Sequence, residues 1–261
     1  MNKLNVILRG FFKYRNLLME LVIRDIKTRY RRSVLGLLWT LLNPLLTMIV
    51  MTIVFSALFR TQIEHFPVYL LSGSILFTLN IEATNTALTS IIGNGSLIKK
   101  VYIPKYLFPL SRVVSSLVNF CFAFLALLIV MAVTGAPFQL SMLLAIVPVF
   151  YLVLFTTGLS LALSALTVFF RDIAHLYSVF ALLWTYLTPI FYPITIIPER
   201  YMVLFEWNPM FHYVNYFRKL ILEGTVPGLT ENLLCLSIGI MALAIGLVTF
   251  YRTQDRFILH I

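Results

Sequence analysis

The residues best suited to bind an anion lie in one short basic stretch. The segment RDIKTRYRR, residues 24–32, carries five cations and one carboxylate in nine residues. Guanidinium and ammonium groups donate charge-assisted hydrogen bonds to phosphates. A cluster of them directly beside an apolar segment is also attracted to anionic lipid headgroups. The stretch therefore predicts phosphate attraction at a membrane surface, through Arg24, Lys27, Arg29, Arg31 and Arg32.

A second candidate is Glu82, the lone acid inside an apolar segment. Ser74, Thr78, Glu82, Thr86 and Ser90 recur at intervals of four residues and so share one face of a helix. Such a stripe in a membrane helix faces protein or water rather than lipid. Two interpretations stay open, namely hydrogen bonding to a neighbouring helix and the lining of a channel.

Aromatic residues gather between positions 177 and 217, where 13 of the 38 Phe, Trp and Tyr residues fall. One interpretation is an aromatic belt at the membrane–water interface. The other is a stacking surface for sugar rings, because aromatic planes pack against their C–H faces while Tyr and Trp donate hydrogen bonds. The two interpretations can hold for different residues.

Few other residues offer chemistry. Cys121 and Cys235 lie in apolar runs and are predicted to be packing residues. The four histidines show no metal-ligand spacing, and the sequence contains no G-x-x-x-x-G-K-[ST] phosphate loop. We therefore predict that this chain binds no metal, cofactor or nucleotide. An enzyme would need converging acids or a Ser/His pair, and Asp172 beside Arg171 is more simply explained as an ion pair.

The composition indicates the kind of element that positions these residues. Of the 261 residues, 60% are hydrophobic and 11% are charged, and the mean hydropathy is +0.93. Soluble domains carry about 25% charged residues. A globule of this size could not bury so much apolar surface, so the sequence predicts an all-α integral membrane protein.

Six apolar segments are predicted to cross the membrane within a single domain, residues 1–261. A helix needs about 20 apolar residues to do so. The 58 uncharged residues between Arg112 and Arg171 are too long for one helix, and the Gly and Pro of TGAPFQLS, residues 134–141, divide them. The predicted spans are 36–59, 66–92, 113–133, 142–169, 173–193 and 233–251.

The charge distribution predicts the orientation. The arm 1–35, the loop 93–112, Arg171 and the C-terminal tail hold 16 of the 20 basic residues. The positive-inside rule places this side, with both termini, in the cytoplasm. The same arm is too charged for a cleavable signal peptide. Nucleic-acid binding is the competing interpretation of a basic protein, but no basic patch lies on a soluble domain, so we predict no nucleic-acid partner.

Three segments are more elaborate than simple turns. In the arm, apolar residues recur every four positions from Tyr14 to Tyr30, which predicts an amphipathic helix in the headgroup plane. The loop 93–112 contains a short apolar helix, about Leu97–Val101, that is either an exposed docking peg or a turn at the membrane surface. Residues 194–231 mix aromatics with prolines, which predicts short re-entrant helices in the outer leaflet.

Together these segments resemble one family, the membrane permeases of ATP-binding-cassette exporters for polysaccharides and polyol phosphates such as O-antigen, capsule and teichoic acid. The matching stretches are RDIKTRYRRSVLGLLWTLLNPLL, LIKKVYIPKYLFPLSR, VFFRDIAHL and TPIFYPITIIPE followed by NPM. They occur in order and cover nearly the whole chain. The resemblance implies a transport subunit of the bacterial plasma membrane rather than an enzyme.

The resemblance also implies partners. A second copy of the chain would complete the pore, and a separate cytoplasmic ATPase dimer would hold ATP and Mg. The segment 11–30 would be the interface helix. The segment 97–105 would be the coupling helix that contacts the ATPase, through Leu97, Ile98, Lys99, Lys100, Val101, Tyr102, Pro104 and Lys105.

The cargo implied by the resemblance is a polysaccharide on an undecaprenyl-diphosphate lipid, moved through a tunnel rich in aromatic side chains. Mapped by position, the tunnel residues are Trp39, Trp184, Tyr186, Phe191 and Tyr192. The five cations of residues 24–32 would attract the lipid diphosphate at the entrance. Two alternatives remain, an exporter of a small molecule or drug on the same fold and a lipid flippase that acts alone.

Overall fold

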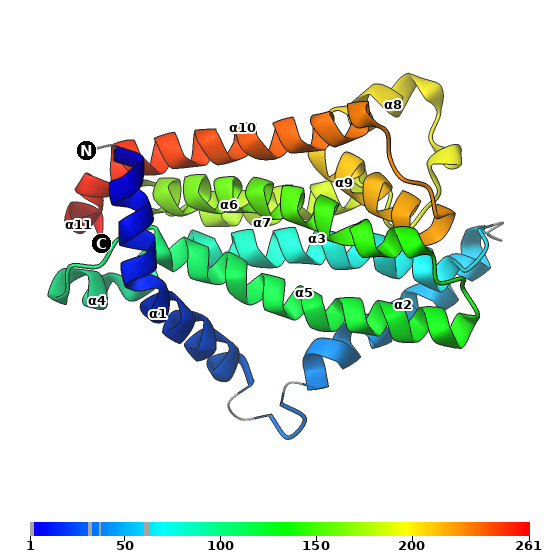
Figure 1. Ribbon diagram of the computed structural model, residues 1–261, viewed down its shortest axis with the longest axis horizontal. Coiled ribbons are helices and arrows are strands. Elements are labelled where there is room, and N and C mark those ends of the chain that lie inside the picture. The colour runs from blue at the N-terminus through cyan, green and yellow to red at the C-terminus, as the bar shows by residue number, and fades with distance from the viewer. Residues whose placement is uncertain (1–2, 31–32, 37, 60–62) are drawn as a thin grey trace.

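The computed structural model describes residues 3–30, 33–36, 38–59 and 63–261. Over these residues the chain is all-helical, and no strand occurs among them (Figure 1). The long helices lie roughly along one axis. Helix α1 (Lys3–Tyr30) begins at the same end of this bundle as the C-terminal α11 (Phe257–His260). We call this the N/C end, and the opposite end the α8 end after α8 (Glu199–Glu206).

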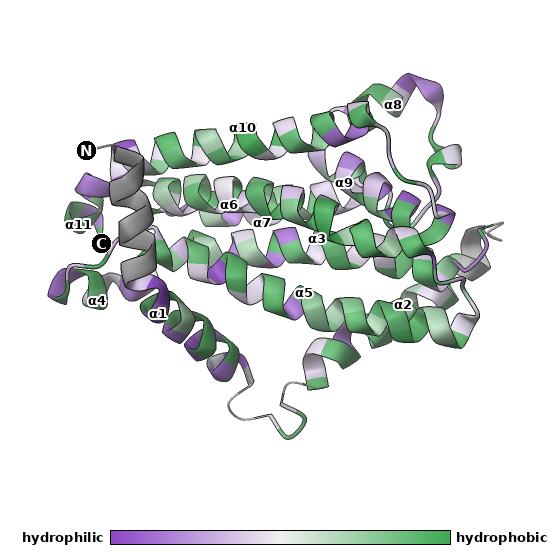
Figure 2. Ribbon diagram, in the orientation of Figure 1, coloured by the Kyte–Doolittle hydropathy of each residue, from purple (hydrophilic) through white to green (hydrophobic). Residues whose placement is uncertain are grey.

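Five helices are long and apolar enough to cross a membrane, which fits an integral membrane protein. Figure 2 shows that their residues are mainly hydrophobic, whereas many hydrophilic residues lie on the coloured part of α1 and on α8. The five are α2 (Leu38–Phe59), α3 (Phe66–Leu88), α5 (Leu107–Thr134), α6 (Ile146–Phe169), which follows a 3-10 turn over Leu140–Ala145, and α10 (Leu229–Thr253).

The predicted fifth span, 173–193, is shorter in the structure. Helix α7 covers Ile173–Leu187, 15 residues, and at 1.5 Å per residue it reaches about 22 Å, less than the hydrocarbon thickness of about 30 Å. Pro189 and Pro193 follow, and each lacks the backbone N–H that a further helical turn would need. The sixth crossing that the sequence predicts therefore depends on this short helix.

The ends of two other helices differ from the predicted positions for a different reason. Helix α5 begins at Leu107, six residues before the predicted position 113, and so includes Arg112. Arg112 stays inside the helix because Asp25 of α1 neutralises it at 2.7 Å. Helix α3 ends at Leu88 instead of residue 92, and a 3-10 turn (Ile92–Asn94) leads into α4 (Gly95–Lys100).

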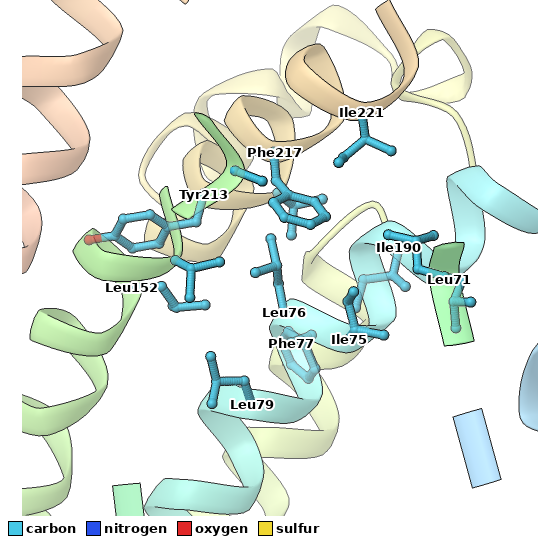
Figure 3. Packing of buried hydrophobic residues seen from close by; sticks show 14 of the residues in the cluster. Leu71, Ile75, Leu76, Phe77, Leu79, Leu152, Ile190, Tyr213, Phe217 and Ile221 are labelled. Atoms are coloured by element: carbon cyan, nitrogen blue, oxygen red, sulfur yellow. The ribbon is translucent and has the colours of Figure 1, made fainter. Parts of the chain in front are cut away.

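Helix α3 lies at the centre of the main core. Leu71, Leu76 and Leu79 are almost completely buried, against Leu152 of α6 and Phe217 of α9 (Figure 3). Helices α6 and α10 approach even more closely, because a Cβ atom added to Gly246 would lie 2.1 Å from the carbonyl oxygen of Gly158. Small residues allow such contact between membrane helices.

A second core closes the N/C end. It joins Leu18 and Leu21 of α1 to Ile98 of α4, Phe108 of α5 and Phe257 of α11. At the α8 end, short helices connect α7 to α10, within the segment 194–231 for which re-entrant helices were predicted. They are a 3-10 turn (Ile194–Ile196), α8, α9 (Pro209–Arg218) and a π turn (Lys219–Glu223).

Candidate functional site

Two cavities adjoin each other between α1, α2, α3 and α5. The first, which we call the central cavity, has a volume of about 640 Å³ and is partly open. Its walls are two facing stripes with a spacing of four residues, one on α2 and one on α3, together with the chain that follows α7. The α2 stripe is Trp39, Asn43 and Thr47, the α3 stripe is Ser74, Thr78 and Glu82, and Phe191 lies in the third wall.

The second cavity, which we call the arginine cavity, lies between α1, α3 and the first turns of α5. It has a volume of about 610 Å³. Three arginines line it, Arg24 and Arg29 from α1 and Arg112 from α5. Only Arg29 and Glu82 belong to both the arginine cavity and the central cavity among the lining residues that the structure describes. This pair therefore stands at the junction of the two spaces.

The geometry at the junction is compact. The Arg29 guanidinium donates to Oε1 of Glu82 at 2.5 Å, and the Asn119 amide of α5 donates to the same oxygen at 2.6 Å. The Glu82 side chain keeps 19% of its surface exposed. Glu82 thus makes the hydrogen bonds between helices that one interpretation predicted, and it also lines both cavities.

A second set of contacts fixes α1 to the bundle. Arg112 donates to Asp25 at 2.7 Å, Arg24 lies 3.6 Å from the same carboxylate, and Arg24 donates to Oδ1 of Asn94 at 3.2 Å. Asp25 is only 8% exposed. A buried carboxylate of this kind persists only when it is paired, so the Asp25–Arg112 bridge holds α1 against α5.

The predicted entrance cations separate in the structure. Arg24 and Arg29 line the arginine cavity, whereas Lys27 is exposed and lies outside it. Arg31 and Arg32 fall outside the described residues. Arg112, Asn94 and Asn119 were not recognised as site residues from the sequence, because they belong to other segments that only the fold brings to α1.

The five predicted tunnel aromatics also separate. Trp39 and Phe191 line the central cavity, and Phe191 stacks on Phe55 of α2 with ring centroids 5.4 Å apart. Trp184 does not line it. The residue is 6% exposed, and its indole N–H donates to Oδ1 of Asn208 at 2.7 Å.

Tyr192 and Tyr186 are also outside the residues that line the central cavity. The Tyr192 hydroxyl donates to the backbone oxygen of Tyr186 at 2.5 Å, and the Tyr186 ring is 62% exposed.

The predicted coupling segment, 97–105, is a helix only in its first part. Helix α4 ends at Lys100, and Val101 is extended. Ile98 was expected on the exposed face but is buried in the N/C core, whereas Tyr102 is 92% exposed. Ile98 is buried because α11 packs against α4, a contact between distant segments that the local sequence of the loop does not indicate.

The C-terminal helix holds this segment at several points. The Lys99 ammonium donates to the backbone oxygen of Ile261 and the Lys105 ammonium to that of Gln254, both at 2.6 Å. A Cβ atom added to Gly95 would lie 2.1 Å from Cγ2 of Ile261. Leu97, Lys100, Val101, Tyr102 and Pro104 remain as predicted contact residues, and Val101 and Tyr102 are the exposed apolar ones.

At the α8 end, the side chain of Arg218 on α9 is charged, yet the residue is only 4% exposed. Its guanidinium donates to three backbone oxygens, those of Pro189 at 2.7 Å and of Tyr69 and Ile190 at 3.1 Å each. Its Cζ lies 3.5 Å from the centroid of the Tyr69 ring. This contact, which we call the Arg218 clamp, holds the wall of the central cavity that carries Phe191.

A comparison with known protein families identifies the family to which this chain belongs. Residues 16–222 match the model of the ABC-2 type transporter family. The chain belongs to this family. The match covers both cavities and the segments that form them, and it confirms the resemblance predicted from the sequence.

Relatives of this ABC-2 family member are named for O-antigen export or polysialic acid transport. An O-antigen export system permease protein of Klebsiella pneumoniae is 31% identical over 244 residues, 93% of each chain. One of Myxococcus xanthus is 29% identical over 96% of this chain and 97% of its own. A polysialic acid transport protein of Escherichia coli is 23% identical over 95% and 97%.

Proposed function

We propose that this chain is the membrane subunit of an ATP-driven exporter that moves undecaprenyl-diphosphate-linked polysaccharide, of the O-antigen, capsule or teichoic-acid type, across the bacterial inner membrane. Both termini, and with them the N/C end, would lie in the cytoplasm. The support comes from membership of the ABC-2 family and from relatives that match over nearly their whole length and are named for O-antigen export or polysialic acid transport.

The lining of the central cavity is the observation that carries the proposal. Aromatic faces from Trp39 and Phe191 stand beside the amide of Asn43 and the hydroxyls of Thr47 and Thr78. Sugars present apolar C–H faces and a rim of hydroxyl groups, so a lining of this composition suits a passing glycan. Stacking on aromatic planes accepts different sugars and permits the polymer to slide, just as it accepts different bases on proteins that bind single-stranded nucleic acids.

A second copy would complete this path. The central cavity is partly open, and its α2 wall is mostly exposed, with only 11% of the spanning window of α2 buried. Two copies that meet along α2 would enclose a shared channel. Their association in lipid would depend on packing rather than on the hydrophobic effect, because lipid tails are as apolar as the helix surface.

Energy would come from a separate ATPase dimer, which would hold ATP and Mg. The exposed Val101 and Tyr102 beside α4 would contact it. Because α4 packs against α1, α5 and α11 in one core, a displacement of this contact would move those helices together. The movement would change the seam between the two copies, and the polymer would advance.

Deletion of the gene in its host tests the proposal. We expect the long-chain surface polysaccharide to disappear and lipid-linked polymer to accumulate inside, with recovery by the wild-type gene. Full surface glycan combined with lost resistance to a small toxic compound would instead support the small-molecule exporter. Export of lipid-linked glycan by the purified chain without an ATPase would support the flippase that acts alone.

A further inference from the structure

We propose that the arginine cavity is the binding site for the diphosphate ester of the incoming lipid, and that Glu82 holds part of this site until the diphosphate displaces it. The inference deepens the proposed function and depends on it for the identity of the lipid. The proposed site is a defined cavity rather than a broad basic face of α1, and it includes Arg112 and Asn119 of α5.

The charges in the cavity are unbalanced. Among the described residues that line it, three guanidinium groups face two carboxylates. Asp25 neutralises Arg112 at 2.7 Å and lies 3.6 Å from Arg24, so one carboxylate serves two of the cations. An anion that entered the cavity would balance the remaining charge, and arginine suits phosphate oxygens because its planar fork donates two bonds at once.

The surroundings add further hydrogen-bond donors. The side chains of Asn94, Asn119, Ser115 and Ser116 line the same space, and the Oγ of Ser115 and the Nε of Arg112 are buried without a hydrogen-bond partner among the described residues. Buried polar groups are normally hydrogen-bonded. The volume of about 610 Å³ falls within the range of about 300–1,000 Å³ that is usual for small-molecule sites.

Glu82 occupies the position that a phosphate oxygen would take. Its Oε1 accepts from both Arg29 and Asn119, one donor from α1 and one from α5. When a diphosphate takes over these donors, the Glu82 carboxylate loses its partner and turns away. Because this pair separates the two cavities, its exchange would also open the way from the arginine cavity to the central cavity.

The test uses the full chain purified into phosphatidylcholine nanodiscs and titrated by calorimetry with farnesyl diphosphate, a short isoprenoid diphosphate. Inorganic pyrophosphate and farnesol are titrated in parallel, so that the contributions of the headgroup and of the apolar tail are measured separately. We expect farnesyl diphosphate to bind more tightly than either fragment. If farnesol bound as tightly as farnesyl diphosphate, the proposal would be overturned.

Two Arg→Gln substitutions on α1, one inside the cavity and one outside it, form the matched comparison. Arg29→Gln should weaken the binding of farnesyl diphosphate by about tenfold or more, since one charge-assisted contact is lost. Arg15→Gln, on the same helix but outside the cavity, should change it by less than about twofold, because exposed charges are screened. Equal losses would mean a general attraction to the basic helix and would refute the site.

Glu82→Gln is the decisive variant, because a damaged fold cannot tighten binding. The amide oxygen still accepts from Asn119, but the competing negative charge is gone. We expect the affinity for farnesyl diphosphate to rise by about threefold or more, and weaker or unchanged binding would refute the role of Glu82. If the three variants change the affinity as expected while the deletion strain keeps its surface glycan, the diphosphate site is supported and the proposed cargo is refuted. If the deletion strain loses its surface glycan but the variants do not change the affinity as expected, the proposed cargo is supported and the diphosphate site is refuted.

Discussion

Replacement of Arg218 by methionine should loosen the wall of the central cavity without unfolding the bundle. The Arg218 clamp supplies the donors for the carbonyl oxygens of Pro189 and Ile190 in the non-helical chain after α7. An unsatisfied buried carbonyl costs about 1–3 kcal/mol. The Ile190 carbonyl would lose its donor, whereas the Pro189 carbonyl would keep a longer hydrogen bond of 3.5 Å from the Tyr69 hydroxyl. The substitution should therefore lower the free energy of opening of this chain by about 1–3 kcal/mol.

Hydrogen–deuterium exchange of the full chain in nanodiscs measures this opening. An effect of 2 kcal/mol corresponds to about a 30-fold increase in the exchange rate, and we expect it in peptides that cover residues 188–197. Arg218→Lys should give a smaller increase, because one ammonium keeps the charge but cannot reach all three carbonyls.

Arg200→Met is the matched control. Arg200 of α8 also lies over a tyrosine ring, that of Tyr201 at 4.6 Å, but it is exposed to solvent. Substitutions at exposed positions change stability by less than about 0.5 kcal/mol, so exchange over 188–197 should match the wild type. If Arg218→Met and Arg200→Met gave the same exchange, the clamp would have no structural role and the reasoning would be wrong.

Three further predictions concern packing and docking. Gly246→Ala should lower stability by about 1–3 kcal/mol in thermal unfolding in detergent, because its methyl group would overlap α6, whereas Gly228→Ala, with no atom within 4 Å, should leave the transition in place. Asn208→Ala should cost about 2–4 kcal/mol in the same assay, since it removes the cap of α9 and the partner of the Trp184 N–H; a shift within error would contradict this. Val101→Ser combined with Tyr102→Ser should reduce co-purification of the ATPase at least fivefold with unchanged thermal stability, and undiminished recovery would exclude these residues from the contact.

The parts of this structure that follow from local composition were predictable from the sequence. The long helices follow from uninterrupted apolar segments, and the stripe that contains Glu82 follows from its spacing of four residues. The end of α7 could have been placed better, because Pro189 and Pro193 already forbid further helical hydrogen bonds. Family membership followed from several stretches that matched in order, although each alone was weak.

The parts that depend on distant contacts were not predictable. Arg112 appeared to end a span, because nothing in the sequence indicates that Asp25 neutralises it. Trp184 was expected in the tunnel, but its N–H is satisfied by Asn208, 24 residues away, and the ring is buried. The burial of Ile98 could not be predicted, because the helix that covers it, α11, lies more than 150 residues later in the sequence.

The three tryptophans happen to sample three different surroundings. Trp39 lines the central cavity at 42% exposure, Trp184 is buried, and Trp207 near α8 is 84% exposed. Indole fluorescence depends on the polarity around the ring and on access to dissolved quenchers. Replacement of Trp184 and Trp207 by phenylalanine would leave one emitter inside the cavity, so that acrylamide quenching of Trp39 would follow the filling and emptying of that space in real time without any attached dye.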